Sequence, residues 1–162
     1  MRILHRVLGA LILVAAVLAI PAPASAAGSV TTWQTGVKVS SPVGRETWII
    51  GSPDAWAWSN LTRCGDWESR AWVRRTGDYV YLKDECADGR SAVAQVTFPY
   101  KGTNYHRMCR NSHGNGTWAR CNFNWPEGPM KQLTAGSNNR STGYMHWDYG
   151  AGVYFSDSGF SA

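Results

Sequence analysis

Short runs rich in Val, Thr, Trp, Tyr and Phe recur along the chain, and 17 Gly and 7 Pro residues help to separate them. This pattern is typical of an all-β domain. No stretch keeps apolar residues at helical spacing for three turns, so a helical fold is excluded. The runs predict an antiparallel β-sandwich, or a partly open barrel, of about eight or nine short strands. The expected strands are Gly36–Ser40, Glu46–Ile50, Ser69–Arg75, Tyr79–Asp84, Ser91–Phe98, Tyr105–Arg110, Thr117–Phe123, Met130–Thr134 and Gly152–Phe155.

The run Ser91–Phe98 shows the two-residue period of a strand most clearly. Its apolar face would carry Ala92, Ala94, Val96 and Phe98. The run Thr117–Phe123 repeats the pattern and places Trp118 on the face opposite Cys121. Both runs therefore predict strands whose side chains alternate between two faces.

The first 26 residues have the pattern of a secretory leader. A basic start precedes the apolar run Val7–Ile20, and Ala24-Ser25-Ala26 is a small-x-small cleavage site. We expect residues 1–26 to be a signal peptide and residues 27–162 to be a single domain secreted into the extracellular medium. The alternative is an uncleaved leader that acts as an anchor, but its core is short for a helix that needs about 20 residues.

Removal of 26 of the 162 residues would leave 136, which is about one domain. Arg2 and Arg6 would be lost while all 11 acidic residues remain, so the net charge would fall from +5 to +3. These values exclude a multidomain enzyme and argue against strong nucleic-acid binding. We expect a monomer with no membrane contact after cleavage. The small, polar ends of the domain, residues 27–34 and 156–162, are expected to be loose or edge segments.

Four cysteines in an exported chain indicate two disulfide bonds. Cys109 and Cys121 flank a Gly- and Asn-rich turn, and a hairpin folded about Asn115 would place them opposite one another. Cys64 and Cys86 bracket a second predicted hairpin. We therefore expect the pairs Cys64–Cys86 and Cys109–Cys121. A zinc site would usually draw its cysteines from close pairs, which are absent here, so no metal and no other cofactor are expected.

Two stretches in the middle of the chain share a pattern with other exported proteins. They are Tyr81–Asp84 followed by Ala87–Ala94, and Cys109–Asn111 followed by Gly114–Trp118, Cys121 and Glu127–Gly128. Over about Ala71 to Gly128 the chain resembles small exported actinomycete proteins of uncharacterised function. The resemblance implies an exported, disulfide-linked β domain, and it implies no catalytic role for any residue.

Nine Trp residues are too many for one small core to hide completely. Trp56 and Trp58 would share one face of an extended segment, where two neighbouring indole rings could stack on sugar rings. The alternative is that most of the Trp side chains fill the space between two sheets. We expect two or three of them to be exposed and to contact a ligand.

Arg70 and Arg74 would share a strand face with Trp72 between them. Such an arrangement forms either a row of stacked Arg and Trp side chains or an anion-binding stripe, and the stacked row is the favoured interpretation. The expected ligand-binding residues are Trp56, Trp58, Trp72, Arg70, Arg74 and Trp118. The leading hypothesis is a secreted, non-catalytic domain that uses them to bind an extracellular glycan, a cell-wall polymer or a protein.

A small secreted hydrolase or nuclease, acting as a toxin, is the first alternative. A nuclease would need a general base and acid beside basic residues, and the candidates His106, His113 and His146 are widely spaced in the sequence. A glycosidase would need two paired carboxylates. Asp66, Glu68, Glu127 and Asp148 are available, and nothing in their spacing favours them. A proteinase inhibitor that presents the turn Ser112–Gly116 is the second alternative.

Three carboxylates lie close together in Asp84, Glu85 and Asp88, followed by Gly89. Carboxylate oxygens at short spacing could bind calcium, but the spacing does not match the calcium loop of an EF-hand. An acidic turn between two strands is the favoured interpretation.

Overall fold

The computed structural model describes residues 28–41, 47–51, 64, 68–74, 77–147, 152–156 and 159–161. The described strands are β1 (Gly28–Thr35), β2 (Val37–Val39), β3 (Thr47–Gly51), β4 (Ser69–Arg74), β5 (Tyr79–Asp84), β6 (Ser91–Tyr100), β7 (Thr103–Asn111), β8 (Trp118–Asn122), β9 (Lys131–Asn138), β10 (Met145–Trp147), β11 (Val153–Ser156) and β12 (Gly159–Ser161). Within these residues no helix is long and apolar enough to cross a bilayer.

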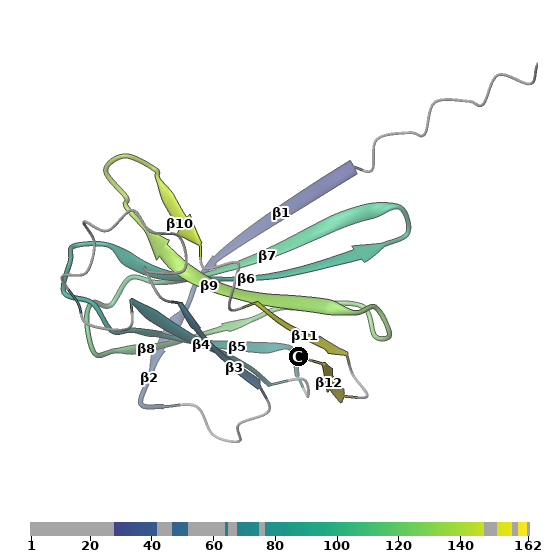
Figure 1. Cartoon of the computed structure of the whole chain (residues 1–162), viewed down its shortest axis with the longest axis horizontal. Helices are drawn as coiled ribbons and strands as arrows, with labels where there is room; N and C mark the ends of the chain where they lie inside the picture. The colour runs from purple at the N-terminus through teal and green to yellow at the C-terminus, as the bar shows by residue number, and fades with distance from the viewer. Residues whose placement is uncertain are drawn as a thin grey trace, which may run out of the picture.

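The strands form two sheets that face each other (Figure 1). The seven-stranded sheet has the order β1-β7-β6-β9-β11-β12, and β10 also pairs with β9. The five-stranded sheet has the order β2-β8-β5-β4-β3. The predicted all-β architecture of two sheets and two disulfide bonds is therefore confirmed.

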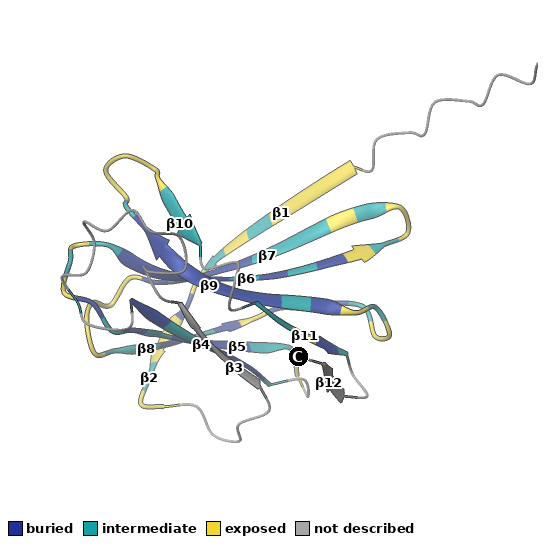
Figure 2. Cartoon of the chain, viewed as in Figure 1, coloured by how far each residue is buried: buried dark blue, intermediate teal, exposed yellow. Residues whose placement is uncertain are grey.

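The core lies between the sheets and is built from alternate residues of the central strands. Figure 2 shows β6, β9, β4 and β5 as the most buried parts of the molecule. The core contains one face of β6 and inward side chains from the opposite sheet. Its members include Ala92, Ala94, Val96 and Phe98 of β6, Val80 and Leu82 of β5, and Cys121 of β8. The two-residue period thus grouped correctly the side chains of β6 and β8 that face the core, although Ser91 and Val93 on the other face of β6 are buried as well.

Strand β1 is the main departure from the expected antiparallel arrangement. The sequence predicted a loose or edge segment over residues 27–34, and β1 is indeed an edge strand, but it runs parallel to β7. A parallel pair needs a long connection, and Gly28 is partnered with Thr103, 75 residues further along the chain. The last described strand, β12, is likewise an edge strand.

The chain passes from one sheet to the other at Gly36, between β1 and β2. Strand β2 pairs with β8 of the five-stranded sheet, whereas β1 belongs to the seven-stranded sheet. A Cβ atom at position 36 would lie 2.9 Å from the Cβ of Ala119 and 3.1 Å from the backbone nitrogen of Arg120. Only Gly allows the backbone to approach β8 this closely.

Both predicted disulfide bonds are present. The Cα atoms of Cys64 and Cys86 are 5.1 Å apart, and those of Cys109 and Cys121 are 5.8 Å apart. The β4–β5 hairpin predicted between Cys64 and Cys86 is also confirmed.

The hairpin proposed for the second disulfide is wrong, although the pairing is right. Strand β7 pairs with β6 and β1, and β8 pairs with β5 and β2, so Cys109 and Cys121 join opposite sheets. The connection between the strands crosses from one sheet to the other. Asn111 holds this crossing, because its Nδ2 donates to the carbonyl oxygen of Thr117 at 2.8 Å and its Oδ1 accepts from the His113 backbone at 3.0 Å.

Candidate functional site

The strand register brings four of the predicted ligand-binding residues onto one face. Arg70, Trp72 and Arg74 alternate along β4 with inward residues of the core, so they lie on the outer face of the five-stranded sheet. Lys83 of β5 is paired with Arg70 of β4 on one side and with Trp118 of β8 on the other. Trp118 therefore lies on the same face, two strands from Arg70. Trp56 and Trp58 lie outside the described residues.

Strand β5 and strand β8 extend this face with further aromatic and basic side chains. We define the cationic face as Arg70, Trp72, Arg74, Tyr79, Tyr81, Lys83, Trp118 and Arg120. It carries four positively charged side chains, and Glu85 forms ion pairs with two of them, Arg70 and Lys83. The sequence identified half of this face and missed the three β5 residues and Arg120 of β8, although they follow the same two-residue period.

Aromatic rings contact each other and lie beneath cations on the cationic face. The rings of Trp72 and Trp118 have centroids 4.9 Å apart, and the Arg120 guanidinium lies 4.9 Å from the centroid of the Tyr79 ring. The Lys83 ammonium lies 5.8 Å from the Trp118 ring centroid. Contacts of these types are attractive because the face of an aromatic ring carries negative charge.

The exposure of the rings differs across the cationic face. Trp72 and Tyr81 are each only 5% exposed, so little of either ring is available to a ligand. Tyr79 and Trp118 are half-buried and still reach the surface. Trp72 therefore supports the Trp118 ring, while Trp118 and the Tyr79–Arg120 stack form the accessible part.

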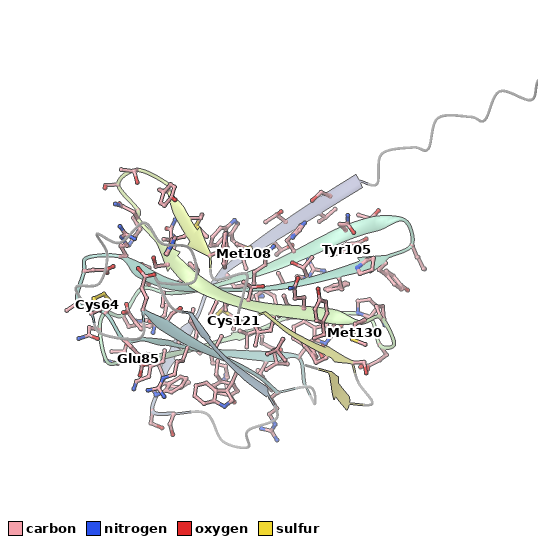
Figure 3. All side chains as sticks on the ribbon, in the orientation of Figure 1. Cys64, Glu85, Tyr105, Met108, Cys121 and Met130 are labelled. Carbon is pink, nitrogen blue, oxygen red and sulfur yellow. A yellow bond between two sulfur atoms is a disulfide. The ribbon has the colours of Figure 1, made fainter. Side chains whose placement is uncertain are left out.

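Arg70 makes an ion pair with Glu85. Its Nε donates to Glu85 Oε2 at 2.5 Å, its Nη2 donates to Oε1, and the Lys83 Nζ lies 2.6 Å from the same Oε1. Burial alone would raise the pKa of Glu85, but the hydrogen bonds and charges of Arg70 and Lys83 outweigh it and lower that pKa. Figure 3 shows Glu85 near the end of the sandwich that carries Cys64.

The three histidines considered for a nuclease make separate contacts. His106 Nδ1 lies 2.6 Å from Gln95 Nε2, and His113 Nε2 lies 2.8 Å from the Gly36 carbonyl oxygen. His146 Nδ1 lies 3.3 Å from Glu68 Oε2. The structure therefore gives each imidazole a different partner and forms no shared acid and base from them.

Glu68 is the centre of a buried polar cluster between the sheets. Ser137 Oγ donates to Glu68 Oε1 at 2.6 Å, Arg90 Nη1 lies 3.5 Å from the same oxygen, and His146 contacts the other oxygen. These contacts tie the start of β4 to β9 and β10. The sequence named Glu68 and His146 separately, and nothing in their spacing indicated that they meet.

The other carboxylates do not assemble into a paired site among the described residues. Glu127 is exposed in the turn after β8, while Asp66 and Asp148 lie outside the described part of the chain. No group of three or more His, Cys, Asp or Glu side chains in that part could hold a metal ion.

The acidic segment after β5 forms turns. Asp84 Oδ1 accepts from the backbone of Cys86 at 3.2 Å, and Asp88 Oδ1 accepts from the backbone of Arg90 at 2.8 Å. Asp84 is buried, and burial raises its pKa from 3.8 to about 6. Its carboxyl group is thus engaged within the protein rather than directed to a shared calcium position.

The raised pKa of Asp84 predicts a pH-dependent stability. The folded state favours the protonated acid, so this stabilisation is complete below pH 3.8 and is lost as the pH rises to about 6. The free energy of unfolding should fall by at most about 3 kcal/mol over this range. Urea unfolding at several pH values should show that Asp84→Asn removes this fall. The exposed-site control Glu127→Gln should keep it, and an unchanged pH profile in Asp84→Asn would contradict the prediction.

Comparisons of the chain with protein-family models, curated proteins and solved structures find no match. The chain is a two-sheet β domain with one disulfide between the sheets, and it carries a basic and aromatic outer face.

Proposed function

We propose that this protein is an exported, non-catalytic domain that binds an acidic glycan through the cationic face. The main supporting observation is the stacking of the Arg120 guanidinium on the Tyr79 ring, 4.9 Å apart, at the surface of the five-stranded sheet. The leader pattern and the two disulfides support export.

The chemistry of the cationic face suits a sugar polymer that carries carboxylate or sulfate groups. Half-buried aromatic rings offer flat apolar surface to the C–H groups of sugar rings. A guanidinium group donates two parallel hydrogen bonds to a carboxylate. Arg74 and Arg120 are the best placed for this role, because Arg70 and Lys83 already share Glu85.

A binding function is favoured over hydrolysis by the state of the candidate catalytic groups. Glu68 accepts from Ser137 and also contacts Arg90 and His146, and it is only 5% exposed. A carboxylate held by these contacts stabilises the packing of β4 against β9 and β10. On the cationic face, in contrast, Tyr79, Trp118 and Arg120 are only half-buried and reach the surface.

The proposal is tested by affinity electrophoresis in gels that contain polygalacturonate, with dextran gels as the neutral comparison. The double variant Arg74→Ala/Arg120→Ala should weaken binding at least about tenfold, because two charge-assisted contacts are lost. Binding of the unmodified protein should also weaken as salt is raised to about 0.5 M.

Arg140→Ala is the matched control, because Arg140 is exposed in the turn between β9 and β10 and its loss changes the net charge in the same direction. It should bind nearly as well as the unmodified protein. Equal weakening by Arg140→Ala would show a nonspecific charge effect. Absence of retardation by polygalacturonate and by a sulfated glycan would overturn the proposal.

The predicted rings Trp56 and Trp58 are tested separately. If they contribute to the same ligand, polygalacturonate should change the tryptophan fluorescence of the unmodified protein, and Trp56→Ala or Trp58→Ala should reduce that change. A fluorescence change of full size in both variants would remove these two residues from the proposed site.

A further inference from the structure

A row of five side chains crosses the outer face of the seven-stranded sheet. The register aligns Thr31 of β1, His106 of β7, Thr97 of β6, Gln132 of β9 and Tyr154 of β11. Their neighbours Val96, Leu133 and Phe155 point into the core, so these five side chains point away from it. None of the five is buried.

An exposed aromatic residue lies at each end of this row: Trp33 beside Thr31 on β1, and Tyr154 itself on β11. Trp33 lies two residues beyond Thr31 on β1 and is 47% exposed, and Tyr154 on β11 is 46% exposed. Four strand spacings separate β1 from β11 in the sheet order, which corresponds to about 19 Å. The two rings are therefore spaced to contact different units of an extended polymer.

The centre of the row is a network of neutral polar groups. His106 Nδ1 lies 2.6 Å from Gln95 Nε2 and 3.3 Å from Thr97 Oγ1. Gln132 is half-buried beside them on β9. Amide, imidazole and hydroxyl groups can donate and accept hydrogen bonds, which matches the hydroxyl groups of a sugar.

The absence of charge distinguishes this surface from the cationic face. We define the neutral face as Trp33, Thr31, Gln95, Thr97, His106, Gln132 and Tyr154; it contains no Asp, Glu, Lys or Arg. The nearest basic residue on the outer side of β7 is Arg110, whose Nη2 donates to Thr35 Oγ1 at 3.0 Å.

Rings at the edges and neutral polar groups between them favour an uncharged carbohydrate over an anionic polymer. A protein partner would favour an apolar centre with a polar rim, which is the reverse of this arrangement.

We propose that the neutral face is a second binding site, which takes an uncharged polysaccharide laid across the strands from β1 to β11. Trp33 and Tyr154 stack on sugar rings, while Gln95, His106 and Gln132 bond to sugar hydroxyls between them. This site lies on the opposite sheet from the cationic face and does not depend on the function proposed there.

The test measures binding of the full chain to insoluble cellulose, insoluble chitin and soluble mixed-linkage β-glucan. At least one of these polymers should bind the unmodified protein, and the affinity should be unchanged by 0.5 M salt, since no charge takes part. Trp33→Ala and Tyr154→Ala should each weaken binding at least about tenfold. Gln132→Ala, which alters one surface amide, should weaken it severalfold with the fold intact.

Tyr144→Ala is the matched control, because Tyr144 is a 60% exposed aromatic residue in the turn before β10 and outside the neutral face. It should bind as well as the unmodified protein, and so should Arg74→Ala/Arg120→Ala. Failure of all three polymers to bind would overturn this proposal and leave the acidic-glycan proposal unaffected. A dimer in sedimentation experiments that Trp33→Ala dissociates would also overturn it, since the face would then join two copies of the chain.

Discussion

Replacing Cys109 and Cys121 together by Ala should lower the free energy of unfolding by about 4 kcal/mol. Loss of a short covalent loop accounts for about 3 kcal/mol through the unfolded chain. The remainder comes from the packing of both residues, which are at most 1% exposed and contribute to the core between the sheets. Denaturant unfolding monitored by tryptophan fluorescence measures the change.

The pair Cys64→Ala/Cys86→Ala is the comparison for this prediction. Its cysteines are 22 residues apart, against 12 for Cys109 and Cys121. Chain entropy alone would therefore make its loss at least as costly. We expect the Cys109 and Cys121 variant to be the less stable of the two, because its bond joins opposite sheets. If the Cys109→Ala/Cys121→Ala variant loses less than about 1 kcal/mol in its free energy of unfolding, the two sheets are held together without the Cys109–Cys121 bond.

Gly136→Ala should also cost about 4 kcal/mol. A Cβ atom at this position would lie 2.0 Å from the backbone carbonyl oxygen of His146 and 3.0 Å from Cε3 of the Trp147 ring. The backbone of β10 would have to move away from β9, and the contact of His146 with Glu68 would be lost with it.

Gly28→Ala is the control for this substitution, because the nearest atom to its added Cβ would be 3.8 Å away. It should change the free energy of unfolding by less than about 0.5 kcal/mol. Hydrogen exchange should show faster exchange in β10 of the Gly136→Ala variant. A variant as stable as the Gly28→Ala protein would mean that β10 does not pack against Gly136 in solution.

The sequence predicted those parts of the fold that depend on short-range pattern. The apolar period of β6, the β4–β5 hairpin and the inward face of β8 all follow from residues close together in the chain. The cysteine pairs were right, but the same Gly- and Asn-rich residues can close a hairpin or cross between sheets. Only the strand order shows that the segment after Asn111 crosses.

The parallel partner of β1 could not be predicted, because nothing local specifies a strand 75 residues away. For the same reason the neutral face was missed. Trp33 lies in a segment expected to be loose or at an edge, and its row forms only when five strands are placed side by side. On the cationic face, Arg70, Trp72 and Arg74 could be grouped because they lie on one strand, whereas their proximity to Trp118 needed the order β8-β5-β4.

The parallel pairing of β1 with the distant strand β7 has a consequence for how the protein is made. Residues 28–35 cannot pair until β7 is available, and β7 ends only at Asn111. During synthesis, a β-prone segment that includes exposed Val30 and Trp33 is therefore made well before its partner strand. Such strands pair readily with other chains. We therefore expect aggregation of this segment before β7 is made to lower the yield of folded protein.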